Sequence, residues 1–134
     1  MPILNDLIGL GMPPEQASVL SNESVSSVPS QSVSSAFTAL GTNLATAAPL
    51  TALVTNVASA AAGTGVALPA SAPIGAFITV RNGGANDIKV YTPVATDSIN
   101  STTGSITLTT LNKQVGIFVR VTATAWIASV ATGT

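Results

Sequence analysis

The chain has 134 residues, no cysteine, no histidine and a formal net charge of −1 at pH 7. These figures exclude disulfides, thiol and imidazole chemistry and the usual zinc sites, and they argue against a nucleic-acid partner. Only 7% of the residues are charged, where soluble domains usually carry about 25%. Either the protein has a neutral Ser/Thr surface, as many β-proteins do, or other subunits cover much of it. We expect the second, because an uncharged small domain tends to self-associate.

The first 22 residues form a distinct segment in which we predict two short helices. Gly9 and Gly11 end the first, and Pro13, Pro14 and Glu15 favour the start of the second. The apolar residues of this segment that are candidates for contact with a partner are Ile3, Leu4, Leu7, Ile8, Leu10, Val19 and Leu20. Such short helices are marginal alone in water, so they need a surface to lie on. That surface is either a partner or the chain's own β body.

Residues 24–35 are rich in serine and have no helical period, which is typical of an extended linker. We therefore divide the chain into an N-terminal arm, residues 1–35, and a β-domain, residues 36–134. The start of the chain lacks the basic stretch of a secretory signal, and the apolar runs are too short to span a bilayer. No membrane partner is expected.

The stretch of the β-domain with the clearest secondary-structure pattern is 73–93. Ala76–Arg81 and Ile88–Thr92 are rich in β-branched and aromatic residues, and Asn82-Gly83-Gly84 between them accepts positive φ. Alternation places apolar residues on one face of each run and polar residues on the other. The pattern predicts a β-hairpin.

The rest of the domain is also predicted to be β. Candidate strands are Ala36–Leu40, Leu50–Ala58, Val66–Leu68, Ser105–Thr109, Val115–Ala123 and Ala125–Val130. Ala58–Ala62 is compatible with a helix, but the Thr/Val-rich sequence before it favours a strand. About eight short strands separated by Gly and Pro predict a compact antiparallel β-sandwich, jelly roll or small barrel.

Alternation along 115–123 places its valines and Ile117 in the core and Phe118 and Arg120 on the solvent face. The predicted core residues are Ile78, Val80, Ile88, Val90, Ile106, Leu108, Val119, Val121 and Trp126.

No catalytic constellation is found, and we predict that the chain is not an enzyme and holds neither metal nor cofactor. A Ser–Lys dyad would need Lys89 or Lys113, but no serine is singled out by its spacing. Asp87 and Asp97 lie in predicted turns, where capping is the ordinary role. An acid–base pair or a calcium site remains the alternative if the fold brings them together.

Two parts of the sequence resemble small structural proteins of tailed bacteriophages. The first is L-I-G-L-G-M-P-P-E-Q-A-S-V-L at 7–20, which is similar to the start of proteins encoded among phage head genes. The second combines I-T-V-R-N-G-G at 78–84, V-Y-T-P at 90–93 and D-S-I-N at 97–100 with Leu108, Phe118 and Trp126, and resembles a virion β-domain. Such domains occur in capsid decoration (cement) proteins and in head or tail fibres, commonly as trimers.

The resemblance implies a virion structural protein, made in the host cytoplasm and located on the capsid surface. We expect a homotrimer that binds the major capsid protein through its arm, and the candidates for the trimer interface are Phe118, Arg120 and Arg81. A fibre, spike or receptor-binding module for carbohydrate is the alternative, followed by a hydrolytic domain. A fibre needs long repeats, heptads or a β-helix, none of which the sequence indicates, so we favour capsid decoration.

Overall fold

The computed structural model describes residues 32–111 and 113–132, which belong to the compact unit Gln31–Thr134. These residues are mostly β-strand, with no helix among them. The eleven strands are β1 (Val33–Ala39), β2 (Ala48–Pro49), β3 (Val54–Ala60), β4 (Gly65–Ala67), β5 (Phe77–Asn82), β6 (Ile88–Tyr91), β7 (Ser98–Ile99), β8 (Thr102–Thr103), β9 (Ser105–Leu108), β10 (Val115–Arg120) and β11 (Ala125–Ala131).

The strands form two sheets that the chain visits in turn. β1, β3 and β5 are parallel neighbours in a seven-stranded sheet of order β1-β3-β5-β10-β11-β7-β8. β2, β4 and β6 are parallel neighbours in a four-stranded sheet of order β2-β4-β6-β9. The chain therefore winds as a β-solenoid of about four turns. In the last turn, β9 and β10 run antiparallel to β6 and β5.

The prediction of a β-sandwich, jelly roll or barrel is thus wrong, and the β-solenoid replaces it. Alternating apolar residues indicate that a strand has one buried face, and strands have one buried face in sandwiches, jelly rolls, barrels and solenoids alike. The folds differ in the partner of each strand, and pairing between strands of successive turns leaves no local mark in the sequence.

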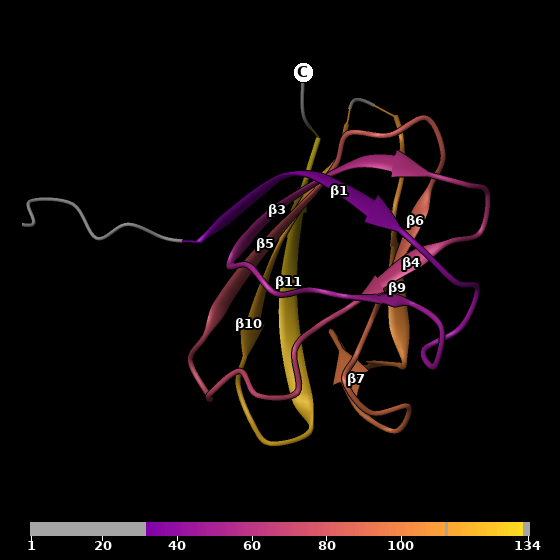
Figure 1. The fold of residues 1–134 in the computed structure, drawn as a ribbon. Helices are drawn as coiled ribbons and strands as arrows, with labels where there is room; N and C mark the ends of the chain where they lie inside the picture. Colours follow the sequence, from indigo (N-terminus) through magenta and orange to yellow (C-terminus); the bar gives the residue numbers. More distant parts are fainter. Residues whose placement is uncertain (1–31, 112, 133–134) are drawn as a thin grey trace, which may run out of the picture. The chain divides into compact units, whose positions relative to one another are not determined.

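The core lies between the two sheets, with β3, β5, β10 and β11 on one side and β4, β6 and β9 on the other (Figure 1). Its largest fully buried side chains are Trp126, Phe118, Ile78, Ile88, Ile99, Leu108, Val57, Val66, Val80 and Val90. Six predicted core residues are confirmed: Ile78, Val80, Ile88, Val90, Leu108 and Trp126. Ile106 and Val119 are half-buried, and Val121 is exposed, which contradicts its prediction.

The hairpin predicted at 73–93 does not form, although both of its strands do. β5 pairs with β3 and β10, whereas β6 pairs with β4 and β9, so the two strands lie in different sheets. The segment between them is a corner of the solenoid. The same Asn and Gly residues suit a corner and a tight hairpin turn, because both need unusual backbone conformations.

Asn82, which is fully buried, holds this corner. Its Nδ2 donates to the carbonyl oxygens of Asn86, at 3.0 Å, and Leu108, at 2.9 Å. Its Oδ1 accepts from the backbone N–H of Gly84 at 3.2 Å. One side chain thus satisfies backbone groups on both sides of the turn and ties the corner to β9.

The faces of β10 are the reverse of those predicted. Phe118 is fully buried and Gly116 is buried beside it, whereas Ile117 is 43% exposed. A Cβ on Gly116 would lie 2.6 Å from the Phe118 ring. The glycine therefore makes room for the phenyl ring inside the core, a packing reason that counting apolar residues along the strand does not detect.

The two predicted helices fall in residues 1–22, outside the described residues, as does most of the predicted linker. β1 begins at Val33, so the boundary predicted between residues 35 and 36 lies inside this strand. Within the described ranges, no helix is long and apolar enough to cross a membrane.

Trp126→Ala should lower the free energy of unfolding by about 3–5 kcal/mol, because a fully packed indole is replaced by a cavity. Trp126 is 1% exposed, whereas Leu111 is 71% exposed. Leu111→Ala is therefore the control, and urea unfolding of both variants at equal protein concentration measures the difference. A loss below about 1 kcal/mol for Trp126→Ala would show that the ring is not packed.

Asn82→Asp should be destabilising by about 3–5 kcal/mol, because a buried carboxylate would face two carbonyl oxygens with nothing to donate. The control is Asn100→Asp, since Asn100 makes the same type of bond to Ala128 but is exposed to water. Thermal and urea unfolding should show a small change for the control. Equal losses for both variants would mean that burial of Asn82 does not matter.

Candidate functional site

Of the three predicted interface residues, Phe118 lies in the core and is not exposed to a partner. The other two are arginines on neighbouring strands of the seven-stranded sheet. The arm residues predicted to contact the capsid, Ile3 to Leu20, lie outside the described residues.

Arg120 joins three loop carbonyls to the core. Its Nη1 donates to the carbonyl oxygens of Ala70, at 2.9 Å, and Ala72, at 2.7 Å, and its Nη2 donates to that of Ala123 at 2.7 Å. The guanidinium carbon lies 5.7 Å from the centroid of the Trp126 ring, within the range of a cation–π contact. This arginine is therefore part of the fold, and its side chain is already engaged.

Arg81 lies on the outer face of the seven-stranded sheet and is half-buried. Its Nη1 donates to Oδ1 of Asn56 on the adjacent strand β3 at 2.8 Å. Among the strands of this sheet, Arg81 and Arg120 are the charged residues. The guanidinium of Arg120 binds loop carbonyls. Of the charged residues on these strands, Arg81 is therefore the one whose side chain lies on the outer face.

The same outer face carries a row of apolar side chains across β5, β10 and β11. Val119 is opposite Phe77 on one side and opposite Ile127 on the other. Side chains directly opposite in antiparallel strands are about 5 Å apart, so the row is continuous. Phe77 is 62% exposed and Ile127 is 51% exposed. With Ile117 on the next row, these four residues are called the outer patch below.

An antiparallel sheet with one solvated face normally presents polar residues there. The outer patch departs from that rule, and contiguous exposed apolar surface usually marks an interaction site. We take the outer patch as the candidate functional site. The sequence pattern does not reveal the outer patch, because alternation predicts Val119 in the core and marks Phe77 only as part of a strand. The clue in the sequence was Gly116, which indicates the crowded face of β10.

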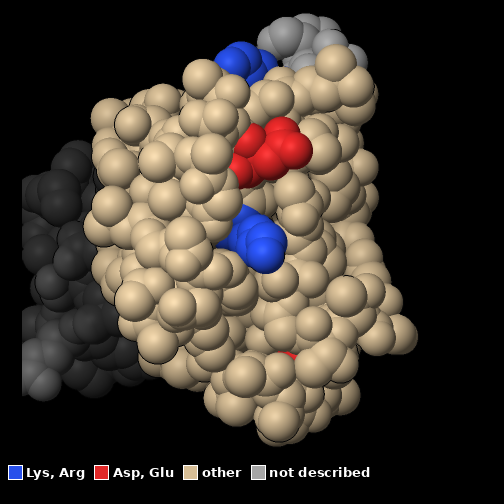
Figure 2. All heavy atoms as spheres, turned by 90° about the vertical axis from the view of Figure 1, so that its right-hand side faces the viewer, with Lys and Arg blue, Asp and Glu red and all other residues tan. Residues whose placement is uncertain are grey.

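The side of the body that carries β4, β6 and β9 also has few charges (Figure 2). Lys89 on β6 is exposed, and two further charged groups near this sheet bind its loops: Oδ1 of Asp87 accepts from the backbone N–H of Thr110 at 2.8 Å. Nζ of Lys113 donates to the carbonyl oxygens of Gly83 and Gly84, at 3.2 and 2.8 Å. These contacts are the capping roles that short polar loops need.

Asp87 and Asp97 lie in the loops at the two ends of β6, and the described residues contain no group of three or more acidic, His or Cys side chains placed to hold a metal. Asp97 is buried, and its Oδ2 has no hydrogen-bond partner. Neither acid–base catalysis nor calcium binding gains support from this arrangement.

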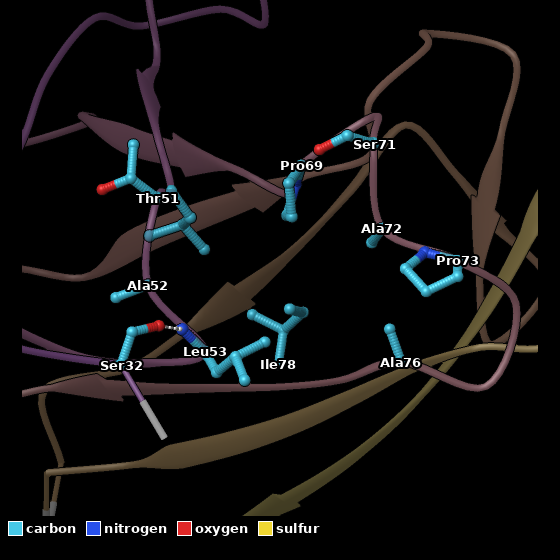
Figure 3. Close-up of a pocket in the computed structure, with 11 residues that line it drawn as sticks. Ser32, Thr51, Ala52, Leu53, Pro69, Ser71, Ala72, Pro73, Ala76 and Ile78 are labelled. Carbon is cyan, nitrogen blue, oxygen red and sulfur yellow. Dashed lines mark hydrogen bonds between the residues drawn. The ribbon is translucent and has the colours of Figure 1, made fainter. Parts of the chain in front are cut away.

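A cleft of about 440 Å³ opens at one end of the body, between the segment 50–53 and the loop 69–76 (Figure 3). It is lined by Ser32, Leu50, Thr51, Ala52, Leu53, Pro69, Ser71, Ala72, Pro73, Ala76 and Ile78. The backbone N–H of Leu53 donates to Oγ of Ser32 at 3.0 Å, which fixes one wall. The cleft is mostly apolar with three small hydroxyl groups, so it suits an apolar side chain better than a charged ligand.

Comparisons with known protein families, curated proteins and solved structures give no match to this chain.

Arg120→Lys should lower the free energy of unfolding by about 1–3 kcal/mol, because one ammonium group cannot replace a planar fork that binds three carbonyls. Arg81→Lys is the matched control, since Arg81 makes one side-chain bond and is only half-buried. Urea unfolding at a fixed protein concentration compares the two. If Arg81→Lys were the more damaging change, Arg120 would not hold the loops.

Proposed function

We propose that this chain is a structural protein of a bacteriophage virion that decorates and stabilises the capsid. In this proposal, residues 1–35 attach to the major capsid protein, and the β body is a knob on the capsid surface. The knob is a homotrimer. The protein is made in the host cytoplasm and acts without metal, cofactor or catalysis.

The observation that carries the proposal is the outer patch. An apolar row of Phe77, Val119 and Ile127 lies on the outer face of the seven-stranded sheet. Arg81 is the charged residue that the strands of this sheet place on that face. A face of this composition is stable in water when another protein covers it. A component of a protein assembly meets that condition permanently, and the sequence resemblance to phage structural proteins supports a virion as that assembly.

The arm supplies the contact with the shell. Its seven candidate contact residues are apolar, and each contributes roughly 1.5–3 kcal/mol in gross terms if a partner buries it. Ordering the arm opposes this gain. Three arms on one trimer act together, and their combined affinity exceeds that of a single arm.

A fibre, spike or receptor-binding module is the second candidate, and the solenoid itself favours it. The sequence gives no sign of the β-helix from which a fibre can be built, but the prediction that none is present is wrong, because the body is a β-solenoid. Four turns stacked at about 4.8 Å span only about 20 Å, which is short for a fibre. For carbohydrate binding, the aromatic rings of Tyr91 and Trp126 are buried, whereas Phe77 is exposed.

Deletion of residues 1–23 should abolish binding to capsid shells that lack this protein, while the β body stays folded. The physical reason is that the apolar contact residues are removed and the core between the two sheets is untouched. Co-sedimentation with shells measures binding, and circular dichroism checks the fold. The full chain is the control and should bind.

Retained binding by the shortened chain would move the shell contact to the β body. If the full chain does not bind capsid shells but does bind host cells, the result would favour the receptor-binding module and refute capsid decoration.

A further inference from the structure

We infer that the outer patch is the surface through which two or more copies of this chain associate, with the Phe77–Val119–Ile127 row at the centre of the interface. This inference deepens the proposed function by naming the surface and its partner. Phe118 and Arg120, expected to lie in a trimer interface, do not belong to it, because one is in the core and the other binds loop carbonyls.

The first argument is the position of the row. β10 lies between β5 and β11, so Val119 is on an interior strand of the sheet. A shift of an edge strand therefore cannot bury its side chain. The loops that the chain could fold over the row are committed elsewhere: Arg120 ties Ala72 and Ala123 to the inside of the sheet. Only another molecule, or a segment outside the described residues, can cover this face.

The second argument is area. The outer face of β1, β3, β5, β10 and β11 measures about 24 Å across the strands and about 20 Å along them, given the usual strand spacing and rise. Each copy thus offers about 500 Å², and two copies bury about 1,000 Å², the size at which a specific interface becomes plausible. The face is large enough for a second copy.

The third argument is charge. Arg81 is four residues from Phe77 along β5, or about 13 Å at the rise of an extended strand. A symmetry axis through the apolar row therefore brings apolar residues together and keeps the Arg81 side chains of different copies at the periphery. The bond between Arg81 and Asn56 also holds the guanidinium down along the sheet. Because like charges stay apart, the face is compatible with a copy of itself, and no acidic partner is needed to neutralise it.

The test uses the full chain and two substitutions, Ile127→Glu and Phe77→Glu, each at an exposed position of the row. A carboxylate there stays hydrated in a monomer but must be desolvated in the association, so each change should weaken self-association by at least about 100-fold. Leu111→Glu is the matched control, because Leu111 is 71% exposed and lies in the turn that joins β9 to β10, outside the apolar row. Sedimentation velocity at micromolar concentration gives the mass, and circular dichroism verifies the fold.

We expect a dimer or trimer for the wild-type chain and for Leu111→Glu, and monomers for both variants of the row. A monomeric wild-type chain overturns the inference, as does assembly of the two row variants with wild-type strength. An effect of Leu111→Glu equal to theirs also overturns it. The readout needs no capsid, so an oligomer that fails to bind shells would refute capsid decoration and leave this inference standing.

Discussion

The arrangement of this protein depends on how Asn82 satisfies the backbone at the corner that follows β5. The chain leaves one sheet and enters the other there, and because Asn82 and Gly84 are buried, their polar groups need partners within the protein. Asn82 donates to two carbonyls and accepts one N–H, and one of these bonds reaches β9 across the sheet boundary. With the corner fixed, Ile78 and Val80 face Ile88 and Val90 across the core instead of beside them in one hairpin.

The second determinant is the choice of the inward face of β10. Gly116 leaves space for the Phe118 ring, and the carbonyls of two loops bind the guanidinium of Arg120. These contacts hold a glycine, an aromatic ring and a charge on the buried side. Consequently the β-branched residues Ile117 and Val119 face outward, and the apolar surface that would have filled a core becomes available to another molecule. The internal packing of one strand thereby determines the outer surface of the protein.

The positions of most strands could be predicted from the sequence, because alternation and the Gly and Pro residues between runs act locally. The pairing could not. The residues 82–84 suit a hairpin turn and a solenoid corner equally well, and what distinguishes them is a bond to Leu108, 26 residues away. The outer patch was missed for a related reason: Phe77, Val119 and Ile127 become neighbours only through the register of three strands. The short strands β2, β7 and β8 were also missed, since two residues are too few to show a period.

The mixed direction of the strands has a consequence for the order of folding. In the seven-stranded sheet, β10 and β11 are joined by the short turn 121–124, whereas β5 must wait for β10, more than thirty residues later, to gain its second neighbour. Closing a loop of this length is entropically costly and slows the pairing of β5 with β10. In a chain made from its N-terminus, the edge of β5 that does not face β3 therefore stays unpaired until β10 is available. The sheet that the first turns begin is completed only by strands near the C-terminal end of the chain.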